Sequence, residues 1–312
     1  MRYLIVGGTS VFGRPLVDIL HEKNVTEEII ATKLQGEEGY SGAHWVDLDL
    51  RDAGKTEEVI QQAGADIIFD FATQDSVSQA WKNQKETVDV NIIGTINLLN
   101  AIKDLEKKPR LVIGGSGEEY GRIGFSEQPI EESIRPKPVN IYGASKASQT
   151  MFAELYAKAY GLDVVIVRTF NETATDQDDK FAISSFCHQF ARIKEGTQAP
   201  VIHTGNINNI RNFTDVRDLA RAFDMVADKG KSGEVYNAAR EEGISLRDII
   251  QILEKLTGVN VQVVTDRSKV RPSDAPSVVA NVEKIYREVG WKAEIPIEDT
   301  LKAMLEKWES TN

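Results

Sequence analysis

The chain has 312 residues, 41% of them hydrophobic, which is enough for one large domain or two closely packed domains with a sizeable core. Lys and Arg number 37 against 48 Asp and Glu, so the net charge is −11 at pH 7. This acidic balance excludes a broad cationic surface for nucleic acid or anionic lipid. Any phosphate group is therefore expected to be bound by a few local residues.

Cysteine and histidine usage limits the compartment and the cofactors. The single cysteine, Cys187, excludes an internal disulfide, and the four scattered histidines have no zinc-ligand spacing. We expect a cytoplasmic protein without a bound metal. No apolar run approaches the ~18 residues of a membrane span, and the first residues lack a signal-peptide pattern, so they are expected to be folded structure.

Short β-branched runs alternate with stretches of helical period through the first half of the chain. They predict strands over residues 3–6, 29–32, 44–46, 67–71, 111–113 and 164–169. Runs such as 163–167 are apolar on both faces, as expected when helices cover both sides of a parallel sheet. The sequence therefore predicts an α/β fold with a doubly wound parallel sheet of the Rossmann type.

Beyond residue 169 the sequence becomes richer in polar loops and prolines. Residues 216–227 and 234–239 are nevertheless typical of one more helix and one more strand of the sheet. We therefore predict two interleaved domains. The dinucleotide-binding domain would comprise residues 1–170 plus 213–240, and a smaller, C-terminal substrate domain would comprise residues 171–212 plus 241–312.

Two predicted helices, 87–105 and 144–160, have more apolar positions than one packed face requires. Pairing of these helices with their symmetry mates would form a four-helix seam between two copies of the chain. The pattern favours a homodimer of this kind, or else an ordinary interface inside one chain.

The first predicted strand runs into Gly7-Gly-Thr-Ser10-Val11-Phe12-Gly13, after which a helical pattern begins. Strand, glycine turn and helix in this order predict a dinucleotide site, with the pyrophosphate facing the amides that open the helix. Gly7 would form the turn, and Gly13 would let the helix pack close to the strand. Ser10 replaces the middle glycine of the motif, so a purely structural turn is the alternative.

The second predicted strand ends in Ala31-Thr32-Lys33, without the acid that usually binds the ribose hydroxyls of NAD. Lys33 would suit a 2′-phosphate, which predicts NADP as the cofactor. If Lys33 is an ordinary surface lysine, NAD remains the alternative.

Tyr142-Gly-Ala-Ser-Lys146 places a phenol and an ammonium one helical turn apart on the same face. A cation so close is expected to lower the pKa of Tyr142 and so let it act as a general acid or base. Chance alone produces this spacing readily in a chain with eight tyrosines. A second observation supports it, because Ser116 follows the predicted strand 111–113, at the edge where open α/β sheets bind ligands.

With Ser116 at a strand end and Tyr142 and Lys146 on the next helix, the sequence resembles the extended short-chain dehydrogenase/reductase family over essentially its whole length. Within the family it is most similar to reductases of GDP-4-keto-6-deoxy-D-mannose, which are related to GDP-mannose 4,6-dehydratase. The similar segments are residues 116–121, Arg168-Thr-Phe-Asn171, residues 205–218, Glu234-Val-Tyr-Asn237 and Arg271-Pro-Ser-Asp274-Ala-Pro276.

The resemblance implies that Tyr142 is the catalytic acid or base, that Lys146 binds the cofactor ribose and the tyrosine, and that Ser116 binds the substrate oxygen. The cofactor contacts that it implies, together with those of the glycine loop, are Gly7, Ser10, Val11, Phe12, Gly13, Lys33, Asp49, Leu50, Ala72 and Thr73. Asp49 and Leu50 would contact the adenine, and Ala72 and Thr73 would lie along the cofactor.

For a nucleotide-diphosphate sugar, the resemblance implies that Ser76, Glu118 and Asn171 lie near the hexose. Arg211 and Arg271 would bind the diphosphate, for which the planar guanidinium fork is suited. Two alternatives stay open: a simple ion pair of Arg211 with Asp215, and an ordinary loop carboxylate at Glu118.

One segment departs from the family pattern. Relatives usually continue Phe-Asn-His-x-Gly-Pro-Gly-Gln, whereas here Phe170-Asn171 is followed by Glu172-Thr-Ala-Thr-Asp-Gln177. Because glycines are lost and carboxylates gained in a loop that borders the sugar, the hexose is expected to differ more than the reaction.

The implied function is NAD(P)H-dependent reduction of a nucleotide-diphosphate 4-keto-6-deoxyhexose, with hydride delivered to C-4. The alternative is a nucleotide-sugar 4,6-dehydratase or 4-epimerase, since Glu118 or Glu119 could accept the C-5 proton. A non-catalytic dinucleotide sensor is a third hypothesis, but it has no need for Ser116, Tyr142 and Lys146 together.

Overall fold

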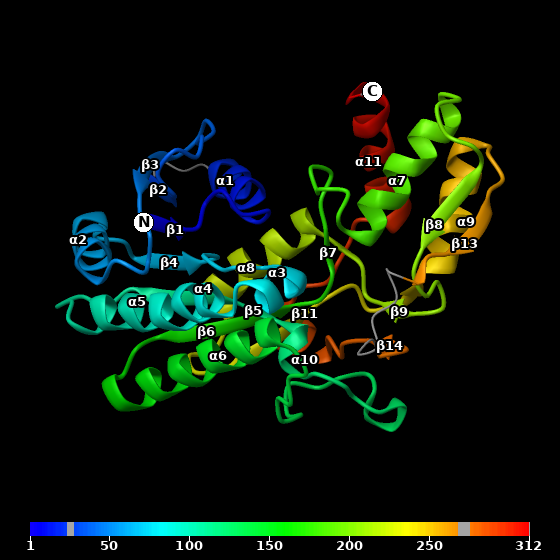
Figure 1. Cartoon of the computed structure of the whole chain (residues 1–312). Coiled ribbons are helices and arrows are strands. Elements are labelled where there is room, and N and C mark those ends of the chain that lie inside the picture. Colours follow the sequence, from blue (N-terminus) through cyan, green and yellow to red (C-terminus); the bar gives the residue numbers. More distant parts are fainter. Residues whose placement is uncertain (24–27, 268–274, 312) are drawn as a thin grey trace.

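The computed structural model describes residues 1–23, 28–267 and 275–311. Its centre is a seven-stranded sheet in the order β11-β6-β5-β4-β1-β2-β3, in which all neighbouring strands are parallel (Figure 1). The strands are β1 (Arg2–Val6), β2 (Glu28–Lys33), β3 (His44–Asp47), β4 (Ile67–Asp70), β5 (Arg110–Ser116), β6 (Val164–Thr169) and β11 (Val235–Ala238). The chain builds outward from β1 to β3 and then in the other direction from β4 to β11. This order confirms the predicted doubly wound parallel sheet.

Side chains alternate across the central strands, so both faces of the sheet are buried. In β1, Tyr3 and Ile5 belong to the core on one face, while Leu4 and Val6 belong to the core on the other. This is why the strands have continuous apolar runs rather than the polar–apolar alternation of a half-exposed sheet.

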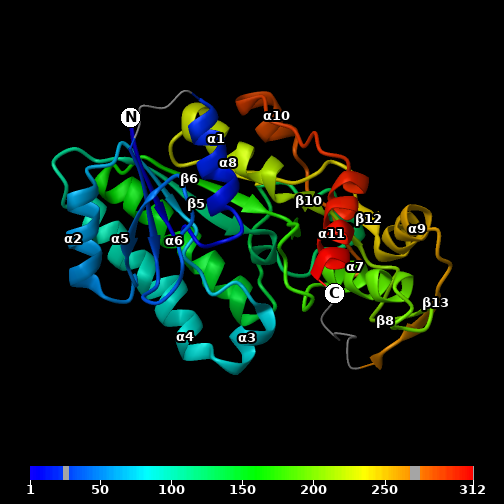
Figure 2. The same ribbon diagram turned by 90° about the horizontal axis from the view of Figure 1, so that it is seen from above.

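Helices cover both faces of the sheet (Figures 1 and 2). The helices on the Tyr3 face are α1 (Gly13–Glu22), α8 (Val216–Lys229) and α10 (Glu283–Val289). Those on the Leu4 face are α2 (Ala53–Ala63), α5 (Gly94–Lys103) and α6 (Ile141–Tyr160). Helix α8 and strand β11 confirm the late helix and strand predicted at 216–227 and 234–239.

The helix predicted over residues 87–105 is not continuous. It consists of α4 (Gln84–Val88), a wider π-helical turn over Asp89–Ile93, and then α5. Within that turn the buried Asn91 accepts a hydrogen bond from the backbone N–H of Gln74 at 2.7 Å. The spacing of apolar residues in this segment does not predict the π-helical turn. The turn is associated with Asn91, whose partner Gln74 lies in a distant loop.

Helix α6 begins earlier than the predicted residue 144, because Asn140 caps it. The side-chain oxygen of Asn140 accepts the N–H of Gly143 at 2.7 Å, which satisfies one of the free amides of the first turn. Tyr142 therefore lies inside the first turn of the helix, and Lys146 lies one turn further along it.

A second, smaller core lies beyond the carboxyl ends of the strands, on the right of Figure 1. Its helices and paired strands are α7 (Ala182–Lys194), α9 (Leu246–Thr257), α11 (Ile297–Thr311), β8 (Val201–Thr204) and β13 (Gln262–Thr265). Short strand pairs join it to the sheet: β7 (Glu172–Thr173) with β10 (Thr214–Asp215), and β9 (Ile210–Arg211) with β12 (Ile244–Ser245) and β14 (Ser277–Val278). This core draws on both late segments of the chain, as an interleaved arrangement requires.

One part of the late sequence packs with the sheet instead. Ile285 and Val289 of α10 and the following Trp291 are buried in the core of the Tyr3 face, and the Trp291 indole donates to the Asp218 carbonyl at 2.9 Å. The domain boundaries stay a prediction.

Among the described residues, no helix combines the length and the apolar character that a membrane span needs.

Candidate functional site

The candidate site lies where the chain leaves the carboxyl ends of β1, β4, β5 and β6. The strand order reverses between β1 and β4, and open α/β sheets bind ligands at such a switch point. The glycine loop follows β1, Ala72 and Thr73 follow β4, Ser116 ends β5, and Asn171 follows β6. The topology therefore brings most of the predicted residues to one edge of the sheet.

In the glycine loop, backbone segments approach each other too closely for a side chain at two positions. Gly7 has φ +73°, and a Cβ there would lie 2.7 Å from the backbone nitrogen of Ala72. A Cβ at Gly13 would overlap the carbonyl of Gly8. Both positions therefore require glycine, as predicted from the motif.

The same loop leaves hydrogen-bonding groups without protein partners. Among the described residues, the buried Ser10 hydroxyl oxygen has no hydrogen-bond partner, and no side chain caps the start of α1. A buried polar atom without a partner is costly, and free amides at a helix start attract anions. The residues present thus fit the pyrophosphate of a dinucleotide, with Val11 and Phe12 beside Ser10 in the loop.

Lys33 ends β2 opposite Asp47, and its ammonium lies 2.7 Å from the Asp47 carboxylate. The sequence did not suggest this partner, because Asp47 comes from the neighbouring strand β3. Lys33 is thus neither a solvated surface lysine nor an unpaired cation that is available to a phosphate. A 2′-phosphate would have to share it with Asp47.

The next predicted contacts, Asp49 and Leu50, follow β3. Three side-chain hydrogen bonds from Arg51, the shortest 2.6 Å, hold the Asp49 carboxylate and keep its pKa below the usual value. Leu50 is buried, and its Cβ lies close to Gly94 at the start of α5. Both residues lie just past the end of β3, the strand that pairs with β2.

Tyr142 and Ser116 lie next to each other as predicted, close enough for the Ser116 side chain to affect the pKa of the Tyr142 phenol. The pKa of Tyr142, however, is raised rather than lowered. Burial is the main cause, the carboxylates of Glu172, Asp75 and Glu118 add to it, and the Ser116 side chain only partly opposes it. The expectation that Lys146 would lower this pKa is therefore wrong.

The reason lies in the direction of Lys146. Its ammonium is buried and hydrogen-bonded to the side-chain oxygen of Gln149, on the next turn of α6. The carboxylates of Asp70 and Glu119 interact with the Lys146 charge. The cation is therefore already balanced by groups behind the site.

The two adjacent glutamates of the 116–121 loop differ in role. Glu119 is fully buried: it accepts the backbone N–H of Ser116 at 2.9 Å and forms an ion pair with Arg168 at 2.9 Å. Glu118 is exposed, and it accepts the side-chain amide of Asn140 at 2.7 Å. Glu119 therefore fixes Ser116, and Glu118 faces the open side of the site.

The loop after β6 has an unusual backbone. Asn171, at φ 38°, is the one non-glycine residue with positive φ among those the structure describes, and such strained positions occur often at functional sites. Glu172 follows it, and burial together with Asp75 and Glu118 raises its pKa. Glu172 thus joins the site in the segment that departs from the family pattern.

Two of the predicted sugar contacts already have protein partners. Ser76 caps α3 (Val77–Lys82) by accepting the N–H of Gln79 at 3.3 Å, and its hydroxyl also lies 3.0 Å from that of Ser78. Arg211 on β9 donates to the carbonyls of Ile210 and Ala275, each at 2.8 Å.

The alternative pairing of Arg211 with Asp215 is wrong, because Asp215 pairs with Arg217 at 2.7 Å. Arg271 lies outside the described residues.

Sequence reasoning missed Asn91, which links two walls of the site. Besides the N–H of Gln74, its side chain reaches the Ser145 hydroxyl at 2.9 Å, next to Lys146. It also missed Gln149 and Asp70. Partners this far apart in the chain leave no local pattern.

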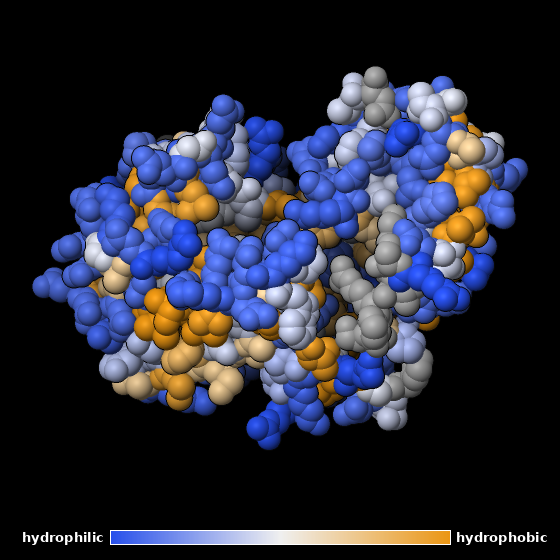
Figure 3. All heavy atoms as spheres, in the orientation of Figure 1, coloured by the Kyte–Doolittle hydropathy of each residue, from blue (hydrophilic) through white to orange (hydrophobic). Residues whose placement is uncertain are grey.

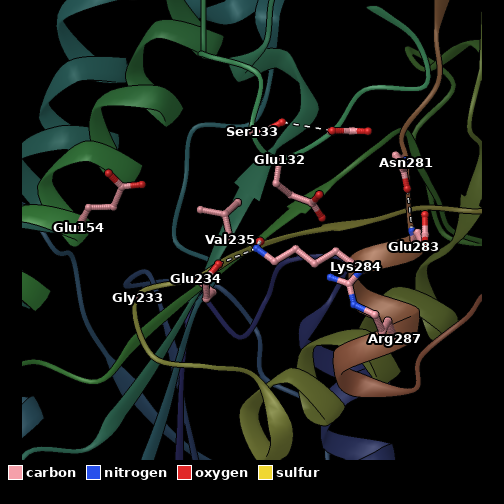
Figure 4. A pocket seen from close by; sticks show the side chains of 11 residues that line it. Glu132, Ser133, Glu154, Gly233, Glu234, Val235, Asn281, Glu283, Lys284 and Arg287 are labelled. Carbon is pink, nitrogen blue, oxygen red and sulfur yellow. Dashed lines mark hydrogen bonds and ion pairs between the residues drawn. The ribbon is translucent and has the colours of Figure 1, made fainter.

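A separate pocket lies at the free edge of β11 (Figure 4). There Glu132 accepts the N–H of Asn237 at 2.8 Å, and Lys284 donates to the Val235 carbonyl at 2.6 Å. These side chains satisfy the unpaired backbone of an edge strand, which is how proteins prevent edge-to-edge association. We therefore assign this pocket a structural role.

Comparison with known proteins identifies the family of the chain. A family model described as GDP-mannose 4,6 dehydratase matches residues 4–304. The GDP-6-deoxy-D-mannose reductase of Pseudomonas aeruginosa is 31% identical over 245 residues, which cover 78% of this chain and 81% of that protein. The dTDP-D-glucose 4,6-dehydratase of Mus musculus is 27% identical over 269 residues, covering 85% and 73%.

Among solved structures, RMD from Pseudomonas aeruginosa complexed with NADPH matches with a TM-score of 0.88 and 28% identity, covering 100% of this chain and 99% of that one. The fold and the family model agree over nearly the whole length. The chain therefore belongs to the GDP-mannose 4,6-dehydratase family of extended short-chain dehydrogenases/reductases.

Proposed function

We propose that this protein is an NADPH-dependent reductase of a nucleotide-diphosphate 4-keto-6-deoxyhexose, with NADH as the possible second cofactor. The observation that carries the proposal is the position of the Tyr142 phenol beside Ser116. Burial and the carboxylate of Glu172 raise the pKa of Tyr142. Reduction of a ketone needs a proton donor at this position. Dehydratases and epimerases must first remove a proton from the C-4 hydroxyl, which needs a base. Tyr142 stands where such a donor or base is needed, and the similarity to a GDP-6-deoxy-D-mannose reductase favours reduction.

Each residue then has a stated role. Tyr142 donates its proton to the O-4 carbonyl oxygen, and the Ser116 hydroxyl hydrogen-bonds to that oxygen as negative charge develops on it. Lys146 holds the ribose, and the loop from Gly7 to Gly13 holds the pyrophosphate. NADPH, when bound, supplies the hydride to C-4.

We assign the sugar to the open side of Tyr142, between Ser76, Glu118 and Asn171. Arg211 and Arg271 would bind the diphosphate, and the Glu172 loop would decide which hexose fits. The relatives named above support a GDP or dTDP sugar, and thus a role in deoxysugar synthesis.

The test is a stoichiometric assay. NADPH is mixed with GDP-4-keto-6-deoxymannose, or with its dTDP or UDP equivalent. We expect one NADPH oxidised per sugar reduced. Conversion of an unmodified GDP-, UDP- or dTDP-hexose to a 4-keto-6-deoxy product without net cofactor change would support the dehydratase instead.

One observation favours that second candidate. Glu118 is an exposed carboxylate near Tyr142, as is Asp75, so it is accessible as the base for a C-5 proton, whereas Glu119 is buried against Arg168. A dehydratase on this scaffold would therefore depend on Glu118 and not on Glu119.

We further propose a cytoplasmic homodimer that uses α5 and α6. Figure 3 shows apolar side chains gathered over this part of the molecule. Met151 and Leu155 on α6 are 61% and 58% exposed, and Val88 and Ile93 near the start of α5 are also exposed. Substitution of Met151 and Leu155 by lysine should convert the dimer into a monomer in light scattering. An unmodified protein that is monomeric would contradict the proposal.

A further inference from the structure

Asp70 is a buried carboxylate that the proposed mechanism does not use. It ends β4, directly before the loop of Ala72 and Thr73, and it is 1% exposed. One of its oxygens accepts the N–H of Ala72 at 3.1 Å, and the other accepts the side-chain amide of Gln149 at 3.2 Å. It thus lies beneath the site and is connected to α6.

Gln149 connects Asp70 to Lys146. Its amide nitrogen donates to Asp70 and, at 2.8 Å, to the Thr95 hydroxyl, while its oxygen accepts from the Lys146 ammonium. Lys146 is 3% exposed, and Gln149 and Thr95 are each 1% exposed. Lys146, Gln149 and Asp70 therefore form a water-excluded chain, which we name the Lys146 bridge.

The charges around the bridge are few. Burial lowers the pKa of Lys146, and the carboxylates of Asp70 and Glu119 oppose that effect. Glu119 already neutralises Arg168 at 2.9 Å. Burial raises the pKa of Asp70 to about 6, although Lys146 and the Ala72 N–H act against the rise. Above that pH the ionised Asp70 is the carboxylate left to balance the Lys146 charge.

We infer that Asp70, acting through Gln149, is a positioning residue that keeps Lys146 protonated and fixed in place at alkaline pH. Since Lys146 is the residue proposed to hold the cofactor ribose, its loss of a proton would weaken the cofactor's attachment beside Tyr142. The inference rests on the proposed function wherever turnover is the readout.

The kinetic test is the pH profile of Asp70→Asn. Asn keeps the size and an acceptor for Gln149 but removes the charge. Below pH 6 the wild-type carboxyl is itself mostly protonated, so we expect rates within about threefold of wild type there. At pH 9 we expect kcat/KM at least about tenfold lower, because Lys146 then loses its proton at lower pH. A loss that is uniform across pH, or no loss at all, would show a merely structural role.

Asp224→Asn is the matched control. Asp224 is also a buried carboxylate with a lysine partner, Lys23 at 2.5 Å, but it lies on α8 at the other face of the sheet. Its substitution should leave the shape of the pH profile unchanged. The same alkaline loss in this variant would overturn the assignment to Asp70.

A second measurement needs no sugar and no Asp70 variant. In the NADPH-bound enzyme, the carboxyl ¹³C resonance of Asp70 is followed against pH by NMR, in wild type and in Lys146→Met. We expect titration near pH 6 in wild type, and a rise of at least about one pH unit once the cation is gone. An Asp70 titration that is unchanged by Lys146→Met would overturn the inference. If no keto-sugar is turned over, the proposed function fails, yet this titration still decides the role of Asp70.

Discussion

Glu119 and Arg168 form an ion pair at 2.9 Å directly behind Ser116, and their side chains are 0% and 3% exposed. Glu119 also accepts the Ser116 backbone N–H, so the pair fixes the end of β5. Removal of one partner from a buried pair leaves an uncompensated charge in a site without water. The position of Ser116 therefore depends on a charge pair that does not touch the proposed substrate.

Glu119→Gln should lower the free energy of unfolding by about 3–5 kcal/mol, since Arg168 then stays charged and unpaired. Urea unfolding measures the change. The control is Lys85→Met, which breaks the exposed pair with Asp89 and should cost less than about 1 kcal/mol. Equal effects of the two substitutions would show that the buried pair is not specially stabilising.

Tyr142→Phe should reduce turnover by about 10²–10⁴-fold, because the phenol supplies the proton in the reacting complex. Affinity for NADPH should stay nearly unchanged, as measured by fluorescence titration. Tyr160→Phe, at the far end of the same helix, is the control and should keep full activity. A Tyr142→Phe enzyme with more than about a tenth of the wild-type rate would refute the assignment.

The pair of Lys33 and Asp47 predicts how the cofactor is selected. Lys33→Ala should weaken NADPH binding by roughly 1.5–3 kcal/mol, the size of a charge-assisted phosphate contact. Asp47→Asn should strengthen it several-fold, because Asp47 no longer competes with the 2′-phosphate for Lys33. NADH binding should change little in either variant. Equal dissociation constants for NADPH and NADH in the unmodified protein would contradict this account.

Asp215 predicts a pH dependence of stability. It caps α8, pairs with Arg217, and accepts the hydroxyl of Thr300 on α11 at 2.7 Å. Although burial opposes it, the bonds from Arg217 and Thr300 hold the pKa of Asp215 below its usual value. Its stabilising effect is therefore present above the unfolded pKa and is lost as pH falls through the folded one.

Asp215→Ala should lower the free energy of unfolding at pH 7 by roughly 2–3 kcal/mol, from the lost cap and the unpaired Thr300 hydroxyl. The difference from wild type should shrink as pH falls below 3.8, because the unfolded chain then binds a proton that folded Asp215, with its lower pKa, does not yet bind. Urea unfolding at several pH values measures this. Thr300→Val keeps the carboxylate and its bonds from Arg217 but removes one of the bonds that lower the pKa, so its pH dependence should be weaker than that of wild type and stronger than that of Asp215→Ala. A gap between Asp215→Ala and wild type that stays constant down to pH 3 would argue against the assigned role.

The sequence predicted the sheet because its strands have continuous apolar runs that only a doubly covered parallel sheet explains. It also predicted that Ser116 and Tyr142 would meet, because a strand end and the start of the next helix lie at the same edge. It could not predict the direction of the Tyr142 pKa shift. That shift comes mainly from burial, and Glu172 and Asp75, which come from loops after two other strands, add to it.

The partners of Lys33 and Lys146 were missed for a similar reason. Asp47 reaches Lys33 across a strand pair, and Asp70 reaches Lys146 through Gln149. Such contacts are set by strand register and helix packing, which residue spacing alone does not encode. Asn91 was hidden because the π-helical turn that orients it has no apolar signature.

Transfer of deuterium tests the central claim most directly. NADPH that is deuterated at the transferable position of C-4 of its nicotinamide ring is incubated with the enzyme and GDP-4-keto-6-deoxymannose, and with the UDP and dTDP analogues. We predict that one sugar product carries deuterium at its C-4, with one NADPH oxidised per product formed, and that Tyr142→Phe forms almost none. Products without deuterium from every sugar, with no net loss of NADPH, would contradict the account of this protein as a keto-sugar reductase.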